Sequence, residues 1–140
     1  MSTALDLDEL EVFRIAERLS DTVWRIVGRW ANFPRGTLGK QLVRAADSVG
    51  ANIAEGFGRG SYQDNRRFVR IARGSLYEVR YWLRRAHARR LVTAEQVATL
   101  QPLLGELAPR LNAYLNAIGP VRRDTPPQQT DPRRHKTRDK

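Results

Sequence analysis

The stretch RRFVRIARGSLYEVRYWLRRAHARR, from Arg66 to Arg90, decides how the rest of the chain is organised. At about 100° per residue, its apolar and small residues gather on one side of a helix. This side consists of Phe68, Ile71, Ala72, Ser75, Val79, Trp82, Leu83 and Ala86. The opposite side is a line of cations around one aromatic ring, made of Arg66, Arg70, Arg73, Tyr77, Arg80 and Arg84. Because the apolar side must be buried against other helices, we expect a helix bundle with a cationic line on its surface.

Charge is the most prominent global property of the sequence. The 140 residues contain 25 Lys and Arg against 15 Asp and Glu, a formal net charge of +10. Residues 59–90 contain ten Arg and two acidic residues, and residues 122–140 contain seven basic and three acidic residues. The remainder of the chain is close to neutral, at −2. This distribution favours a polyanionic partner such as nucleic acid. Arginine-rich codon usage in a GC-rich genome is the alternative explanation.

The composition also limits the class of protein. Apolar residues make up 41% of the chain, enough for one domain with a packed core. No run reaches the roughly 18 uncharged apolar residues of a membrane span, and the acidic N-terminal segment lacks the features of a secretory signal. The chain contains no cysteine, which excludes disulfides and thiol chemistry. We therefore expect a cytoplasmic protein that does not contact membranes.

Four amphipathic segments joined by short turns predict an all-α, up-down-up-down four-helix bundle over residues 1–120. The expected helices cover about residues 7–30, 38–55, 61–90 and 93–118, with a break between the first two at Asn32–Gly36 because of its Pro and Gly. Thr93 and Gln96 have the spacing of a capping box. The last helix contains Pro102 and Pro109 opposite its leucines, so we expect one curved helix, with two shorter helices as the alternative. Residues 121–140 are expected to be a disordered basic tail.

Two features of the first two helices have alternative interpretations. The first helix has two apolar stripes, so it is either a central, well-covered helix or a helix with one face in a subunit interface. The stripes are Phe13, Ala16, Val23, Trp24 and Val27, and Val12, Ile15, Leu19, Ile26 and Trp30. The second helix carries a polar row, either a solvated face or hydrogen-bonded seam between helices, or a row of catalytic or ligand-binding residues. This row consists of Gln41, Arg44, Ser48, Asn52 and Glu55.

The run QLVRAADSVGANIAEGFGRG, from Gln41 to Gly60, is followed by Arg67-Phe68 and by IARGSLYEV at residues 71–79. These residues resemble the four-helix-bundle proteins first found as open reading frames in intervening sequences of bacterial 23S ribosomal RNA genes. The same fold group includes the accessory variability determinant of diversity-generating retroelements. The resemblance covers about residues 7–119. It implies a non-enzymatic protein that assembles as a ring-like homopentamer and, in the retroelement branch, binds a reverse transcriptase and structured RNA through basic surfaces.

Catalysis is not expected from this sequence. His87 and His135 are its only histidines, and no acid–base or metal-ligand motif is present, so we predict no catalytic residue, metal ligand or cofactor.

We expect the protein to bind RNA or an RNA/DNA hybrid, with arginines along the phosphates and tyrosine stacked on unpaired bases. The predicted nucleic-acid-binding residues are Arg59, Arg66, Arg70, Arg73, Tyr77, Arg80, Arg84, Arg85, Arg89 and Arg90. The positive charge fits the retroelement branch, with a reverse transcriptase as partner. The alternative is a protein-interaction scaffold in which the same arginines dock a partner protein and RNA contact is incidental.

Overall fold

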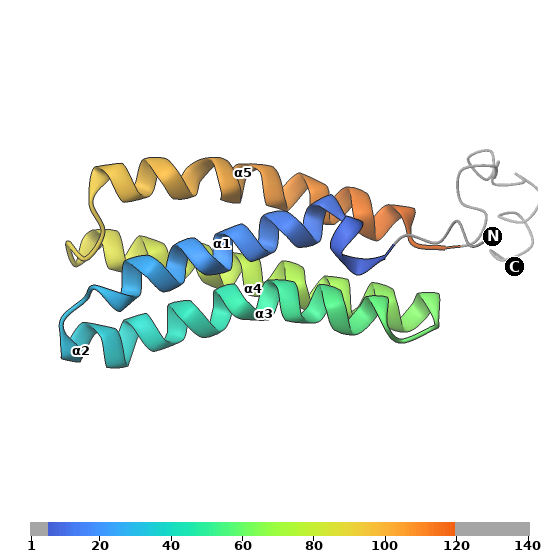
Figure 1. The fold of residues 1–140 in the computed structure, drawn as a ribbon, viewed down its shortest axis with the longest axis horizontal. Coiled ribbons are helices and arrows are strands. Elements are labelled where there is room, and N and C mark those ends of the chain that lie inside the picture. Colours follow the sequence, from blue (N-terminus) through green and yellow to red (C-terminus); the bar gives the residue numbers. More distant parts are fainter. Residues whose placement is uncertain (1–5, 120–140) are drawn as a thin grey trace, which may run out of the picture.

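The computed structural model describes residues 6–119, and all regular structure in this range is helical. Four long helices form a bundle: α1 (Glu11–Gly28), α3 (Lys40–Phe57), α4 (Tyr62–Ala88) and α5 (Ala94–Ala117). Shorter helical segments are η1 (Leu7–Glu9), α2 (Asn32–Pro34) and η2 (Arg35–Gly39). Successive long helices run in opposite directions (Figure 1). This confirms the predicted all-α four-helix bundle, whereas the predicted tail at residues 121–140 lies outside the described residues.

Each long helix packs against two neighbours around the bundle axis. Helices α1 and α4 lie diagonally opposite each other, and each contacts both α3 and α5. Of the four pairs of neighbouring long helices, α3 and α4 share the most extensive contact, and α4 and α5 the least. Helix α4 is therefore held much more closely on one side than on the other.

The two apolar stripes of α1 form one wide face that the chain itself covers. Val12, Ile15, Leu19 and Ile26 of one stripe are buried together with Val23 of the other. Most of both stripes is therefore buried within the bundle, by the two neighbours α3 and α5. Trp24 is the exception, because 66% of its surface is exposed.

The segment between α1 and α3 is helical, so the expected break at Asn32–Gly36 is wrong. The chain is extended at Ala31 and begins a new helical segment at Asn32. Pro34 occupies the first turn of that segment, where its missing N–H needs no partner and its fixed φ suits a helix. Residues Arg35–Gly39 then form a π-helical turn that leads directly into α3. Pro34 thus helps to start a helix and does not stop one.

The buried face of α4 is rotated relative to the face expected from the sequence. Val69 and Leu76 are almost completely buried, whereas Ile71, which the helical pattern assigns to the apolar side, is 43% exposed. The rotation follows from the two neighbours of α4, since its apolar residues must cover the side of α5 as well as the side of α3. The edge of the cationic line consequently lies along α5.

Glycines allow the closest approach between elements of the bundle. A Cβ atom added to Gly56 would lie 2.7 Å from Asn65 Oδ1 and 2.9 Å from Phe68 Cβ. A Cβ atom on Gly39 would lie 2.6 Å from Val27 Cγ1. Contacts this short do not occur around real Cβ atoms, so the approach of α3 to α4 at Gly56 and of η2 to α1 at Gly39 requires that both positions lack a side chain.

Helix α5 begins and continues as the sequence predicts. Thr93 Oγ1 accepts a hydrogen bond from Gln96 N–H, and the Gln96 side chain accepts one from Thr93 N–H, which confirms the capping box. Pro102 and Pro109 are exposed within one continuous helix. The preceding turn contains Arg90 at a φ of 60°, the one non-glycine residue with positive φ among residues 6–119.

Candidate nucleic-acid interface

The cationic line on α4 divides into two rows with different roles. Three of its arginines, spaced seven residues apart, reach across to α5. Arg66 Nη1 donates to the carbonyl oxygen of Ile118 at 3.0 Å. Arg73 Nη1 donates to Asn112 Oδ1 at 3.1 Å, and Arg80 Nη2 to the carbonyl oxygen of Leu104 at 3.2 Å. We call these three residues the inner row, and their guanidinium groups are partly occupied by the fold.

The remaining members of the line, Arg70, Tyr77 and Arg84, form the outer row. Their side chains are exposed, and 61% of the surface of Tyr77 is accessible. Neither arginine of the outer row makes a hydrogen bond or ion pair with another part of residues 6–119. Tyr81 lies on the same exposed side of the helix. The outer row therefore presents free cations and accessible aromatic rings to the solvent.

Arg59 belongs to a different place and is already paired. Its Nε atom lies 3.0 Å from Glu55 Oε2, and its guanidinium stacks over the ring of Phe68 at 4.9 Å from the centroid. Arg67 covers the same ring at 4.7 Å and lies 3.9 Å from Asp64 Oδ1. This cluster joins α3 to α4 at the end of the bundle opposite Arg89 and Arg90, so Arg59 is not part of a continuous patch with them.

The other predicted residues, Arg85, Arg89 and Arg90, lie where α4 ends, and there the structure gathers basic residues that the sequence analysis missed. The C-terminal turns of α1, the segment leading into α3, the C-terminal part of α4 and the start of α5 all meet at the left of Figure 1. Residues 24–44 and 84–95 together contain nine basic residues and one acidic residue, Glu95. We call this region the basic end, and its basic residues are Arg25, Arg29, Arg35, Lys40, Arg44, Arg84, Arg85, Arg89 and Arg90.

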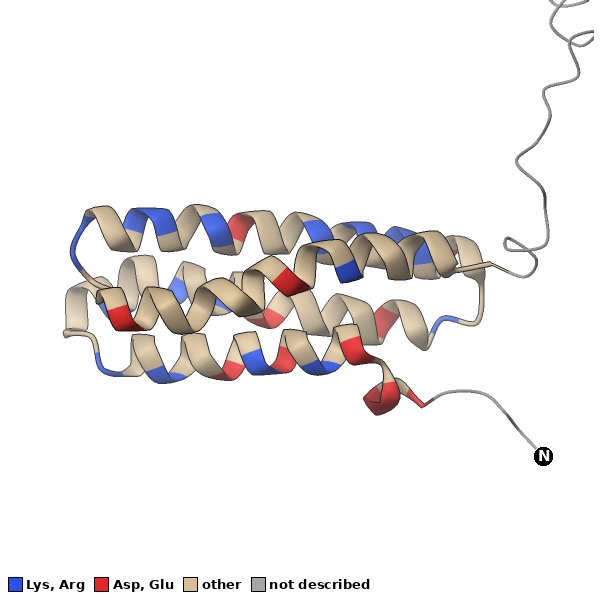
Figure 2. Cartoon of the chain, turned by 90° about the horizontal axis from the view of Figure 1, so that it is seen from above, with Lys and Arg blue, Asp and Glu red and all other residues tan. Residues whose placement is uncertain are grey.

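The positive charge of the described residues is therefore concentrated in two places, along α4 and at the basic end of the bundle. In Figure 2, α4 is the uppermost helix, and basic residues lie along it. The helices α5, in front, and α1, below, carry mixed or acidic residues. A sequence signal for the basic end did exist, since residues 24–44 contain five basic residues and no acidic one. The acidic start of the chain offsets this positive charge in the net charge of the residues outside 59–90 and 122–140.

Two grooves open beside these cations. One, of about 480 Å³, lies between the C-terminal half of α4 and the N-terminal half of α5, with Leu83, Val97 and Leu104 among its apolar lining and Arg80 and Arg84 among its cationic lining. The second, of about 910 Å³, lies at the basic end and is lined by residues of α2, η2, α3 and the end of α4. Both grooves combine apolar walls with basic side chains.

The polar row on α3 is divided between a hydrogen-bonded seam with α4 and an exposed face. Ser48 Oγ lies 2.8 Å from Ser75 Oγ on α4. Asn52 Nδ2 donates to the carbonyl oxygen of Ser48 at 2.8 Å and to Ser48 Oγ at 2.9 Å. Gln41, Arg44 and Glu55 of the same row are exposed. The two central residues of the row thus serve the packing of α3 on α4, as the first interpretation expects.

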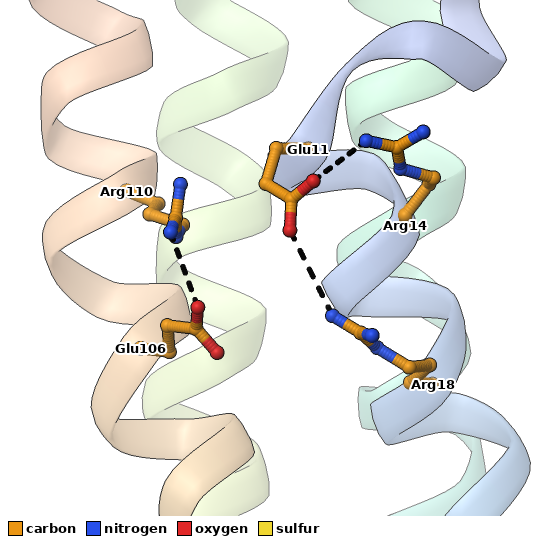
Figure 3. A network of polar contacts seen from close by, with 5 residues as sticks. All are labelled: Glu11, Arg14, Arg18, Glu106 and Arg110. Atoms are coloured by element: carbon orange, nitrogen blue, oxygen red, sulfur yellow. Dashed lines mark hydrogen bonds and ion pairs between the residues drawn. The ribbon is translucent and has the colours of Figure 1, made fainter.

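Four acidic side chains among the described residues, those of Glu11, Glu55, Asp64 and Glu106, form ion pairs on the surface of the bundle. Glu11 on α1 accepts a hydrogen bond from Arg14 Nη2 at 2.6 Å and lies 3.9 Å from Arg18 Nη2, while Glu106 pairs with Arg110 on the neighbouring α5 (Figure 3). The hydrogen bond from Arg14 lowers the pKa of Glu11, helped by the positive charges of Arg14, Arg110 and Arg18 and opposed by desolvation.

No group of three or more His, Asp or Glu residues within residues 6–119 is placed to hold a metal ion. None of the helices in the same range combines the length and the apolar character needed to cross a membrane.

Comparison with known proteins identifies the family of this fold. In a crystal structure, a protein of unknown function from the S23 ribosomal protein family of Bacteroides thetaiotaomicron has the same fold, with a TM-score of 0.63 and 24% sequence identity. The alignment covers 76% of this chain and 95% of that one. Among curated proteins, no match to this chain is found. Residues 8–113 match the family model described as 23S rRNA-intervening sequence protein, and because this match spans most of the chain, the protein belongs to that family.

Proposed function

We propose that this protein is a non-enzymatic RNA-binding module whose outer row on α4 contacts the backbone of structured RNA or an RNA/DNA hybrid. The observation that carries the proposal is that Arg70 and Arg84 are exposed and unpaired within the described residues, with Tyr77 and Tyr81 between them. Arg70 and Arg84 are separated by about 21 Å along the helix axis, a length that covers several phosphates of one strand. The tyrosines supply rings on which unpaired bases stack.

Matched charge reversals test this proposal. The double variant Arg70→Glu/Arg84→Glu should weaken binding of a structured RNA at least tenfold, because two phosphate contacts become repulsive. The control variant Arg14→Glu/Arg18→Glu makes the same change in net charge on α1, diagonally across the bundle, and should leave most of the affinity. Filter binding over a range of salt concentrations measures both effects, and each lost phosphate contact should reduce the salt slope by about 1. If both variants lost the same RNA affinity, the loss would be due to net charge alone, and the proposal would be contradicted.

We further propose that the protein acts as a homopentamer and as an accessory subunit of a reverse transcriptase in a diversity-generating retroelement. An apolar surface for self-association is available on α1 and α3, where the exposed Trp24 borders a groove that also contains Val27, Gly39 and Val43. Five copies would repeat the outer row, so modest contacts would add through multivalency. Sedimentation of the purified protein tests the pentamer. A neighbouring gene for a reverse transcriptase with a template repeat would support the retroelement role, and a location within a ribosomal RNA gene would contradict it.

The groove between α4 and α5 favours a second candidate function, a protein-interaction scaffold. Leu83, Val97 and Leu104 form part of its walls, with the cations Arg80 and Arg84 beside them. An amphipathic helix with acidic flanks would suit such a groove. Under this alternative, a partner protein would remain bound after nuclease treatment, and the substitution Val97→Asp would release it while RNA binding remained unchanged.

A further inference from the structure

The groove at the basic end has a composition that the fold does not explain. Its lining contains the rings of Phe33 and Trp82, the aliphatic side chain of Leu91, and the cations Lys40 and Arg89. Its volume of about 910 Å³ lies in the range of sites that bind small molecules. Phe33 is 80% exposed, more than any other large apolar side chain among residues 6–119. It is therefore a groove residue with little role in the core.

Aromatic rings in the lining of the groove are suited to stacking on a flat ligand. Phe33 comes from α2 and Trp82 from α4, so two elements distant in sequence contribute rings to one groove. The Trp82 Nε1 atom lies 3.4 Å from Glu78 Oε2 and donates to it, and its ring packs edge to face with Tyr81. These two contacts help to hold the indole in place. Base–aromatic stacking is the main sequence-tolerant contact in proteins that bind single strands.

The charges and polar groups of the groove favour an anionic ligand with hydrogen-bonding edges. Lys40 and Arg89 make no ion pair within residues 6–119, and the surrounding basic end contains nine basic residues against one acidic residue. No acidic side chain lines the groove. Gln41 also lines it, and its amide makes no side-chain hydrogen bond within the described residues. An amide of this kind can both donate to and accept from the edge of a base.

We propose that this groove, which we call the end groove, binds an unpaired nucleotide of an RNA strand. The base would stack against Phe33 and Trp82, and its phosphates would lie toward Lys40 and Arg89. The inference rests on the proposed function that this protein binds RNA, and it adds a second contact with a different preference. The outer row on α4 holds a backbone of any sequence, whereas the end groove takes a single-stranded end or an unstacked base.

The test uses two RNA hairpins that differ only at one end. One hairpin is blunt, and the other carries a short single-stranded 3′ extension containing 2-aminopurine, whose fluorescence is quenched on stacking. Wild-type protein should bind the extended hairpin about tenfold more tightly, the range expected for one stacked base, and should quench the probe. Phe33→Ala should lose both effects and keep its affinity for the blunt hairpin. Tyr62→Ala, which removes an exposed ring at the opposite end of the bundle, should behave like the wild type.

Each result separates the end groove from the proposed function of α4. If the wild type shows no preference for the extension, or if Phe33→Ala retains it, the inference is overturned, even when the blunt hairpin binds well. If the blunt hairpin does not bind but the extension binds through Phe33, the end groove stands and the outer row does not. Vesicles of anionic lipid form a third arm. Binding to them that depends on Phe33, without a preference among the RNAs, would assign the groove to membranes and overturn the inference. Thermal melts confirm that both variants remain folded.

Discussion

Helix α4 is joined to its two neighbours in opposite ways. Against α3, it packs closely: Gly56 leaves no space for a side chain beside Asn65 and Phe68, and Ser75 lies within hydrogen-bond distance of Ser48. Against α5, the contact is sparse, and Arg66, Arg73 and Arg80 reach across it. Small groups thus fix one seam, and long cationic side chains span the other.

The difference explains which side of α4 is accessible to solvent. A seam of small residues excludes water and solutes, because interiors at this density leave few voids. A seam spanned by arginines leaves a groove of about 480 Å³ between α4 and α5 and places cations along its edge. The same helix therefore supplies the rigid part of the bundle on one side and its accessible basic surface on the other.

The largest expected effect comes from filling the close seam. Gly56→Ala should lower the free energy of unfolding by about 1–3 kcal/mol, because the added methyl group overpacks the site. Gly74→Ala on α4 is the matched control, since nothing lies within 4 Å of its added Cβ atom, and it should stabilise the protein by about 0.5–1 kcal/mol. Urea denaturation of both variants measures the contrast. Equal effects would mean that the α3–α4 contact is looser than described.

A smaller loss should follow from removing the inner row. The triple variant Arg66→Ala/Arg73→Ala/Arg80→Ala gives up three hydrogen bonds that are partly solvated, so we expect a loss of about 1–2 kcal/mol. The double variant Arg70→Ala/Arg84→Ala should change stability by less than about 0.5 kcal/mol. Amide hydrogen exchange should increase mainly in α5 in the triple variant. Equal destabilisation by the two variants would remove the distinction between the rows.

The hydrogen bond between the two serines is the next test of the close seam. Ser75→Ala should cost about 0.5–1.5 kcal/mol, since Ser48 keeps its contact with Asn52 but loses its partner on α4. A double-mutant cycle with Ser48→Ala isolates the coupling energy of the pair. A coupling energy of zero would show that this seam depends on shape alone.

The smallest expected effect concerns Glu11 on the exposed face of α1. Its pKa is lowered in the folded state, chiefly by the hydrogen bond from Arg14. The resulting stabilisation is present above the ordinary carboxyl pKa of about 4.3 and is lost as the pH falls through the lowered value. NMR titration of the Glu11 carboxyl group should give a midpoint below the usual one, and Arg14→Gln should move it back toward that value. A midpoint that does not change in this variant would contradict the assignment to Arg14.

The sequence predicts most of the fold because its local signals agree with one another. The capping box at Thr93, the helix over residues 62–88 and the continuous helix through Pro102 and Pro109 all follow from spacing and from the physics of helix ends. Pro34 was misassigned because proline breaks a helix in its interior but suits its first turn. Its sequence neighbours do not distinguish these two situations.

The candidate interface was predicted only in part. The cationic line on α4 is real as a pattern, but its division into an inner and an outer row depends on where α5 lies, and helical periodicity contains no such information. The basic end could not be recognised either, because it brings together residues 24–44 and 84–95, which are distant in sequence. Phe33 was likewise treated as part of a turn, and only its 80% exposure beside Trp82 marks it as a candidate contact.

At Arg90, the stability of the fold and the positive charge of the surface favour different residues. A left-handed backbone costs a side chain with a Cβ atom about 1–2 kcal/mol, more than the roughly 0.5–1 kcal/mol of extra chain entropy that glycine loses on folding. With a φ of 60°, this position would suit glycine better than arginine. Selection for a durable fold alone would thus remove a positive charge from the basic end. A stabilising substitution at this turn, Arg90→Gly, would thus make the protein more stable while it lowers the positive charge of the basic end.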